Sequence, residues 1–458
     1  MLCLDNPDGL TNHPQFGHSH NSGVSPIRKS YKKSFMAWHE TLNKRTGRLP
    51  FYQSQRYFAA PREALNTDLK MKVVASHFAL GKGTKRLNVD VCIVTNLCFP
   101  GGNASSTIEE VKYLDRAGYN VKLVHCPRDN NQHNALSMRY FAVRKNIVHW
   151  YEVGDIFAKK LIVRNPGTMS SQFFKSLQNR SRSDESYLVF NNSLYRPSGE
   201  LTFQPDYIKN LIKELNTNKV YLCPIGPMIR SELLQEFLPT EYTYVKEDWT
   251  PTFDISEYYL PVKKTFSSPI TIGRHGRDGA EKWHENTSDL LLAYPNSKDY
   301  KVCILGGANQ IKTRLGSLPS NWEVYEFGSK SPLDYLDSLD VFIYLPHSKL
   351  VEAFGRTIVE AMIAGIPCIL PRRFRDTFEE LPLYSDAERI EELLDKLRKN
   401  DSARIDYCTI VQELAFNKYS SSKIPDRLGY KSNLANNSTR DIDLYKKLQE
   451  YREYFLND

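Results

Sequence analysis

The chain has 458 residues, enough for two or three domains, and its 41% hydrophobic and 25% charged residues are ordinary for a globular protein. It contains no apolar run of about 18 residues, which excludes a membrane-spanning helix of the usual length. The eight cysteines show no paired spacing, and no Cys-x2-Cys or His-Glu-x2-His motif occurs. We therefore expect free thiols in a reducing compartment and no metal site. The N-terminus lacks the apolar core of a signal peptide, which predicts a cytoplasmic protein.

The positive charge is concentrated in the N-terminal segment, residues 1–88. This segment contains 14 Lys/Arg and 5 Asp/Glu, whereas the net charge of the whole chain is only +8. Residues 1–30 are polar and predicted to be poorly ordered, and residues 31–88 mix basic with aromatic side chains. Such a mixture suits an anionic membrane surface or nucleic acid, or else a helical extension whose aromatic residues pack on the main body.

The first predicted β–α unit begins at residue 90. Residues 90–95 read as a strand, residues 99–105 as a loop with Gly101 and Gly102, and residues 106–117 as a helix. A glycine-rich loop in this place fits backbone contact with a phosphate or a sugar, although Pro-Gly-Gly also makes an ordinary turn. The loop is no Gly-x-Gly-x-x-Gly fingerprint, so it does not indicate a nicotinamide cofactor.

Further strands follow at the spacing of repeating β–α units. They are predicted at residues 119–125, 160–164, 187–190 and 220–223. Residues 247–261 lack clear periodicity and are predicted to form an interdomain linker. The pattern therefore indicates an α/β domain over residues 89–250.

A second domain is predicted to begin with a strand at residues 268–273. The loop after it contains Arg274, Arg277 and Lys282. An Arg and a Lys in such a loop can clamp a diphosphate, and the alternative is an exposed charged loop. Helices and strands then alternate, at residues 287–294, 301–306, 324–327 and 332–339.

The stretch from Val341 to Leu370 has the pattern of a strand, a loop, a helix and a strand. Gly355 lies where the helix begins, so a ligand can approach the backbone where free N–H groups bind phosphate. Glu352 and Glu360 can accept hydrogen bonds from sugar hydroxyls there, or can be solvated residues of an ordinary amphipathic helix. His347, in the loop, can reach a phosphate or sugar oxygen or be only structural.

The segment EAFGRTIVEAMIAGIPCIL resembles the Glu-x7-Glu signature of retaining nucleotide-sugar glycosyltransferases, specifically glycosyltransferase family 4. The resemblance implies that Glu352 lies at the donor sugar and that Glu360 binds the ribose. It also implies donor contacts at the start of the helix, from Phe354, Gly355, Arg356 and Thr357. The family usually has an apolar residue in place of Arg356, whose side chain is compatible with a phosphate contact or with a surface ion pair.

The same family has an Arg and a Lys on the leaving diphosphate. Arg274 follows its strand as the family Arg does, and Lys282 is the corresponding Lys. Their separation of eight residues exceeds the usual gap, so Arg277, five residues before Lys282, remains an alternative. The predicted diphosphate clamp therefore consists of Lys282 and one of two candidate arginines, Arg274 or Arg277.

The resemblance is weaker in the first domain. The loop at Gly101 and Gly102 is similar to the family's N-domain glycine loop, which faces the donor phosphates and the acceptor. No counterpart is evident for the histidine that many members have near the acceptor. His125 and His149 are candidates by residue type alone.

The resemblance covers about residues 89–420 and implies an α/β protein of the GT-B fold, with two Rossmann-like domains facing a cleft. After the N-terminal extension (1–88), residues 89–250 would form the acceptor domain and 262–420 the nucleotide-sugar donor domain. Residues 421–458 would form a C-terminal tail and helix, the helix predicted at 441–455.

The implied activity is that of a hexosyltransferase-type enzyme of polysaccharide biosynthesis. It would move a sugar from a nucleoside-diphosphate sugar to a glycan or lipid-linked glycan with retention, using Glu352, Arg274 and Lys282 for catalysis. The nucleotide sugar is a co-substrate, and no cofactor or metal ion is expected. A lipid-linked acceptor would suit peripheral contact with an anionic membrane at its inner face. A transferase that modifies nucleic acid and a non-catalytic nucleotide-sugar-binding protein are the alternatives.

Overall fold

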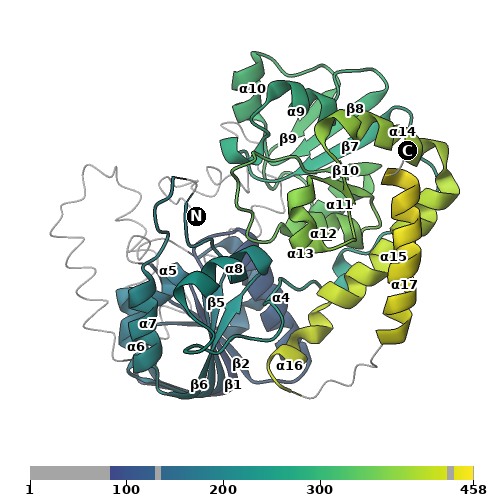
Figure 1. Cartoon of the computed structure of the whole chain (residues 1–458). Coiled ribbons are helices and arrows are strands. Elements are labelled where there is room, and N and C mark those ends of the chain that lie inside the picture. The colour runs from purple at the N-terminus through teal and green to yellow at the C-terminus, as the bar shows by residue number, and fades with distance from the viewer. Residues whose placement is uncertain (1–82, 129–135, 197, 431–437, 457–458) are drawn as a thin grey trace. The chain divides into compact units, whose positions relative to one another are not determined.

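The computed structural model describes residues 83–128, 136–196, 198–430 and 438–456. The chain divides into two compact units between Trp249 and Thr250, which we call unit 1 (residues 1–249) and unit 2 (residues 250–458) (Figure 1). The boundary falls in the segment 247–261, where the sequence predicts a linker. Residues 1–82 lie outside the described residues, so the membrane or nucleic-acid contact predicted for the N-terminal extension stays a prediction.

Unit 1 contains a parallel sheet of six strands. They are β1 (Lys85–Thr95), β2 (Val121–His125), β3 (Ile147–His149), β4 (Val153–Arg164), β5 (Ser181–Phe190) and β6 (Thr217–Pro224), in the order β3-β2-β1-β4-β5-β6. The apolar runs at the carboxyl ends of β1, β4 and β5 are fully buried. Near-continuous apolar runs of this kind are typical of parallel strands that are covered on both faces.

The helices of unit 1 begin with α4 (Gly102–Arg116), which starts four residues earlier than the sequence predicts. The polar residues at its start look like a loop, but the hydroxyl of Ser106 donates to Gly102 O at 3.0 Å and that of Thr107 to Asn103 O at 2.7 Å. These side chains therefore bond back to the helix itself. The other helices are η3 (Met138–Asn146, a 3-10 helix), α5 (Pro166–Met169), α6 (Gln172–Gln178), α7 (Pro205–Glu214) and α8 (Pro227–Glu236).

Unit 2 contains a second parallel sheet of six strands. They are β7 (Ile270–His275), β8 (Tyr300–Leu305), β9 (Trp322–Tyr325), β10 (Val341–Ile343), β11 (Cys368–Leu370) and β12 (Leu383–Tyr384), in the order β12-β11-β10-β7-β8-β9. The sequence predicts that β7 ends at Gly273, but Arg274 and His275 still pair with β8. Arg274 is therefore a strand residue, and its side chain direction is set by the pleat.

The helices of unit 2 connect these strands and continue the chain beyond β12 (Figure 1). They are α9 (Thr287–Ala293), α10 (Asn309–Leu315), α11 (Pro332–Asp337), α12 (Arg356–Ile363), α13 (Arg375–Phe378), α14 (Ile390–Lys399), α15 (Asp401–Tyr419), α16 (Ile424–Arg427) and α17 (Ser438–Leu456). Short 3-10 turns join them: η4 (Ile255–Glu257), η5 (Ala280–Lys282), η6 (Arg372–Phe374), η7 (Ala387–Arg389) and η8 (Ser421–Lys423). The long helix α15 packs against α12 and α17. Among the described residues, no helix combines the length and apolar character needed to cross a membrane.

Both sheets have the same connectivity. In each unit the chain adds two strands on one side of its first strand and then returns to add three on the other side. This is the order of doubly wound nucleotide-binding sheets, and the predicted α/β class with two Rossmann-like sheets is confirmed. In unit 2 the direction changes between β7 and β10, and ligands of such sheets bind outside the carboxyl ends of the strands at that point.

Candidate active site

The carboxyl ends of β7 and β10 in unit 2 bring together most of the predicted site residues. The loop after β7 leads to Lys282 in η5, and the loop after β10 leads to Glu352. Because β7 and β10 are neighbours in the sheet, these two residues meet although they are 70 positions apart in the sequence. Lys282 and Glu352 therefore lie together at the switch point of the sheet, where the strand order changes direction between β7 and β10.

Lys282, Glu352 and Tyr344 form a hydrogen-bonded cluster at this edge. Lys282 Nζ donates to Glu352 Oε2 at 2.5 Å and to Tyr344 Oη at 3.2 Å, and Tyr344 Oη donates to the same Glu352 oxygen at 2.7 Å. An ammonium has three N–H groups, and a carboxylate has two oxygens. One N–H of Lys282 and Oε1 of Glu352 thus remain without a partner in the described part of the chain. Both are available to a ligand.

Tyr344 is a member of this cluster that the sequence did not identify. Burial raises its pKa well above the ordinary value, and the neighbouring Glu352 carboxylate raises it further, so the phenol stays protonated and donates. In the sequence Tyr344 belongs to the apolar run 341–345 and is typical of a core residue. Its position could have identified it, because Tyr344 is the first residue after β10, at the carboxyl edge of the sheet where ligands bind.

Arg274 is completely buried beside the cluster, at 0% exposure. Its guanidinium stacks on Trp283, 3.6 Å from the ring centroid, and its Nη2 donates to Lys282 O at 2.8 Å. Nε and Nη1 are buried without an acceptor among the described residues. Unsatisfied buried donors cost free energy, and an anion at this edge would relieve that cost. The stacking partner Trp283 was also not predicted.

Gly355 forms the N-cap of α12 with a left-handed backbone conformation, φ 88°. A side chain there would be strained, and its Cβ would lie 2.9 Å from Ile358 Cδ1 and 3.6 Å from Glu352 Cγ. The first bond of the helix is the one that Ile358 N donates to Gly355 O, so the preceding N–H groups, those of Arg356 and Thr357, are not used by it. The Phe354 side chain is buried, which leaves only its backbone for a ligand.

Arg356 and Glu360 form a buried ion pair on α12. Arg356 Nε donates to Glu360 Oε1 at 3.0 Å, and the two side chains are 10% and 6% exposed. Arg356 also stacks on Phe253 at 4.0 Å and donates to Tyr258 Oη at 3.2 Å. Of the two roles open to Arg356 from the sequence, the structure favours the ion pair, but the pair is buried and not at the surface. It holds the Glu360 carboxylate 3.9 Å from His275 Nδ1, at the end of β7.

The side chains of Arg277 and His347 form no hydrogen bond with Lys282, Glu352 or Tyr344 in the described part of the chain, although His347 N donates to Glu281 O at 3.2 Å. Arg277 is exposed, and its side chain has no partner among the described residues. His347 Nδ1 accepts a bond from Lys349 N at 3.1 Å and lies 3.7 Å from Glu285. Burial acts to raise the pKa of Glu285, but hydrogen bonds, led by that from the Ser348 hydroxyl, lower it to about 2. The surroundings of His347 are thus those of an anchored loop.

In unit 1, Gly101 and Gly102 are exposed at the start of α4. Nothing lies within 4 Å of a Cβ built on either residue, so the fold of unit 1 does not itself require glycine there. This leaves open space beside the backbone of the kind that the predicted ligand contact needs.

The two histidines considered for the acceptor side, His125 and His149, are buried at the ends of β2 and β3. Their ring centroids are 5.4 Å apart, and His125 Nδ1 accepts a bond from Leu97 N at 3.2 Å. Burial, and secondly His149, lowers the pKa of His125 well below its usual value, which keeps this ring neutral. Sequence reasoning missed a buried ion pair nearby, in which Arg164 Nη2 donates to Glu110 Oε2 at 2.8 Å.

Comparison with known families identifies the segment that contains this cluster. Residues 276–374 match the family model described as glycosyl transferases group 1. The match includes Lys282 and the whole stretch from Glu352 to Glu360. The protein is a glycosyltransferase. No curated protein matches the sequence.

Solved structures of several glycosyltransferases resemble the whole fold. Anabaena HepE, solved in complex with UDP and glucose, is 13% identical, with a TM-score of 0.53 over 75% of this chain and 98% of that chain. A glycosyltransferase from Rickettsia africae ESF-5 is 16% identical, with a TM-score of 0.51 over 80% and 99%. An α-glucosyltransferase solved with UDP is 14% identical, with a TM-score of 0.50 over 73% and 97%. At such identities the likeness shows the fold alone, and that fold is GT-B, as the sequence predicts.

The glycosyltransferase with Tyr344→Phe is expected to lose about tenfold or more in kcat. The change removes one hydrogen bond to the Glu352 carboxylate, and bonds to charged groups contribute about 1.5–3 kcal/mol. Steady-state kinetics should be compared with Tyr451→Phe, which removes a bond of 2.8 Å from a tyrosine to Asp406 outside the cluster. Equal kcat values in the two variants would contradict a role for Tyr344 in the site.

Arg274→Ala and Arg277→Ala are expected to differ sharply. Arg274→Ala should lower both kcat and the free energy of unfolding, the latter by about 2 kcal/mol, because a desolvated cation–π contact is lost. Arg277→Ala should change the unfolding free energy by less than about 0.5 kcal/mol, since its side chain is exposed. Urea unfolding and kinetics on both variants measure this. Equal, small effects on kcat would remove Arg274 from the candidate active site.

Proposed function

We propose that this glycosyltransferase transfers a sugar from a nucleoside-diphosphate sugar to a glycan or lipid-linked glycan, with retention of configuration at the anomeric carbon. The observation that carries the proposal is the meeting of Arg274, Lys282 and Glu352 at the switch point of unit 2, beside the start of α12. This arrangement suits a ligand that combines negative charge with hydroxyl groups. UDP-sugars are the first donors to test, because HepE and the α-glucosyltransferase were solved with UDP.

The reaction breaks the bond between the anomeric carbon and the diphosphate oxygen, so negative charge grows on the diphosphate as it leaves. Lys282, with its unused N–H, and Arg274, with two unsatisfied donors, would stabilise that charge together with the N-terminus of α12. The groups are held by Tyr344 and Trp283 before the ligand arrives, which lowers the cost of reorganisation.

The carboxylates have separate roles in this proposal. Glu352 Oε1 would accept a hydrogen bond from a hydroxyl of the donor sugar, while its Oε2 stays bound to Lys282 and Tyr344. Glu360 would accept bonds from the ribose, in an orientation fixed by Arg356. The acceptor hydroxyl would attack the anomeric carbon from the face that the diphosphate leaves, and its proton would pass to the leaving phosphate. No protein nucleophile is required.

The donor class can be tested by thermal shift and turnover with UDP-, GDP- and ADP-sugars. A ligand that binds only the folded state raises the apparent melting temperature, so the true nucleotide should do so. With the matching donor and a glycan acceptor, product formation should persist in EDTA, because protein cations carry the diphosphate charge. NMR of the product should show the anomeric configuration of the donor.

Three results would count against the proposal. Binding of the donor without release of nucleotide, with any acceptor tried, would favour a non-catalytic binding protein. An inverted product would exclude retention. Loss of activity in EDTA that Mg²⁺ restores would exclude metal independence.

A further inference from the structure

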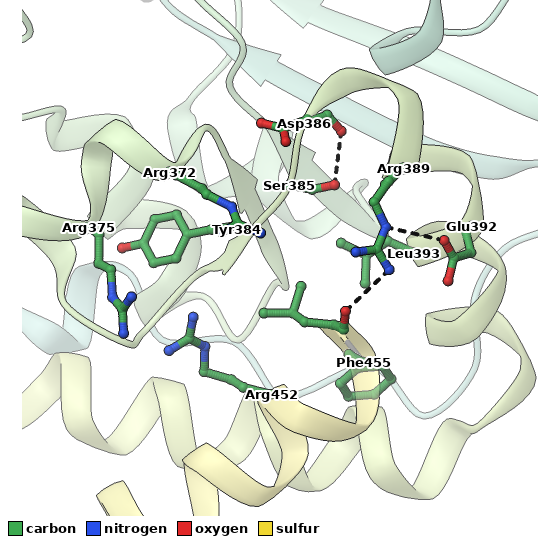
Figure 2. Close-up of a pocket in the computed structure, with 11 residues that line it drawn as sticks. Arg372, Arg375, Tyr384, Ser385, Asp386, Arg389, Glu392, Leu393, Arg452 and Phe455 are labelled. Atoms are coloured by element: carbon green, nitrogen blue, oxygen red, sulfur yellow. Dashed lines mark hydrogen bonds and ion pairs between the residues drawn. The ribbon is translucent and has the colours of Figure 1, made fainter. Parts of the chain in front are cut away.

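A basic pocket lies in unit 2 at the carboxyl ends of β11 and β12, on the β12 side of the same sheet edge that carries the candidate active site (Figure 2). Its volume is ≈ 280 Å³, and it is formed where β11 and β12 end and where the C-terminal helix α17 packs over them. Four arginines from four different elements line it: Arg372 from η6, Arg375 from α13, Arg389 from η7 and Arg452 from α17. The lining contains only two carboxylates, Asp386 and Glu392.

Two of these arginines share one carboxylate. Arg375 donates to Glu380 Oε1 from Nε at 2.7 Å and from Nη2 at 2.5 Å, and Arg452 pairs with Glu380 Oε2. Figure 2 shows the two guanidinium groups directed toward the same region beside Tyr384. Like charges at close range repel, and a single carboxylate cannot neutralise both. Arg375, Arg452 and Glu380 together therefore carry one positive charge in excess.

Arg452 is the buried member of the set. It is 6% exposed, and its Nε has no acceptor among the described residues. Burial, and secondly the charge of Arg375, lowers its pKa to about 10. A buried guanidinium N–H without an acceptor costs free energy, and an anion in the pocket would supply the missing acceptor.

Two further lining residues, Arg372 and Asp386, add a positive charge and a hydrogen-bond acceptor to the pocket. Arg372 is exposed and makes no hydrogen bond or ion pair with a described residue. The carboxylate of Asp386 likewise has no partner within the described ranges, and it lies next to the buried Ser385. Arginines bind phosphate through paired N–H groups, whereas a carboxylate can only accept bonds, for example from hydroxyl groups.

We propose that this pocket binds a sugar phosphate, that is, the phosphate monoester of a small polyhydroxylated compound. Arg372, Arg375 and Arg452 would hold the phosphate, and Asp386 would accept hydrogen bonds from hydroxyls. The volume is close to the lower end of the range of about 300–1,000 Å³ for small-molecule pockets, which suits a compact ligand. This site goes beyond the proposed transferase function and does not depend on it.

The test is isothermal titration calorimetry of the full chain with glucose 6-phosphate, inorganic phosphate and glucose as probes. Glucose 6-phosphate should bind, phosphate should bind more weakly, and glucose should not bind. Arg372→Glu should lower the affinity for glucose 6-phosphate at least tenfold, and this exposed residue can be changed without breaking a described contact. Arg452→Gln should have a similar effect. The matched control is Arg398→Ala, which removes an exposed arginine paired with Asp395 outside the pocket.

Two further measurements separate this pocket from the candidate active site. Lys282→Ala should leave the affinity for glucose 6-phosphate unchanged, and added UDP should not compete with it. The proposal is overturned if no phosphate compound binds the wild type, if Arg372→Glu binds as tightly as the wild type, or if UDP displaces the probe. Equal affinities for phosphate and glucose 6-phosphate would overturn the assignment to a sugar phosphate.

Discussion

Replacement of Lys282 by alanine is expected to lower kcat by about 100-fold or more, while the affinity for the donor nucleotide falls much less. The reason is that negative charge on the diphosphate is largest as it leaves, and a preorganised donor to such charge contributes about 100- to 1,000-fold to kcat. Lys282 is held at 2.5 Å from Glu352 and 3.2 Å from Tyr344, so its position is set before the donor binds. The selectivity among donor sugars should not change, because the lysine is assigned to the diphosphate.

The experiment compares kcat, KM and calorimetric nucleotide affinity for the wild type, Lys282→Ala and Lys301→Ala. Lys301 is a matched control, since it also forms an ion pair in unit 2, with Glu323 at 2.7 Å, but on β8 and β9 and with both side chains almost half exposed. Lys301→Ala should behave like the wild type. A kcat for Lys282→Ala within about threefold of that control would remove the lysine from the proposed mechanism.

The fold was predictable from the sequence because the strands are buried on both faces. Runs such as 341–345 and 366–370 are apolar throughout, and the helical spacing between them leaves few alternatives to a parallel β–α unit. The residues at which helices and strands begin and end were harder to predict. α4 begins at Gly102 because Ser105 N donates to Gly101 O, and β7 extends to His275 because it pairs with β8. Both effects depend on backbone pairing that residue types do not reveal.

The partners of the predicted charges could not be predicted. Lys282 and Glu352 were both candidates, but their contact joins positions 70 residues apart and arises only from the order of β7 and β10. Arg356 was an unexplained departure from the family pattern, and the structure accounts for it by Glu360 and by the segment that contains Phe253 and Tyr258. The interaction partners of these side chains therefore depend on contacts between residues far apart in the sequence, and the order of the strands in the sheet brings those residues together.

Replacement of Glu360 by glutamine is expected to weaken UDP binding by about 10- to 100-fold, if UDP proves to be the donor nucleotide. Hydrogen bonds from hydroxyls to a charged group contribute about 1.5–3 kcal/mol, and each 1.4 kcal/mol is a factor of ten in affinity. Glutamine is preferable to alanine here because Glu360 is 6% exposed and paired with Arg356. Alanine would leave that arginine without its buried partner and would lower the free energy of unfolding as well.

The assignment of Glu360 to the ribose is tested most directly by pairing this variant with a change in the ligand. The wild type should bind UDP about tenfold or more tightly than 2′-deoxy-UDP, because the deoxy compound lacks a hydroxyl that the carboxylate accepts. Glu360→Gln should bind the two with nearly equal affinity, which is the coupling expected when two changes remove the same contact. Glu323→Gln, in the exposed pair with Lys301, should keep the full wild-type discrimination. If Glu360→Gln still discriminates against 2′-deoxy-UDP as strongly as the wild type does, the carboxylate does not contact the 2′-hydroxyl, and its pairing with Arg356 serves only to stabilise unit 2.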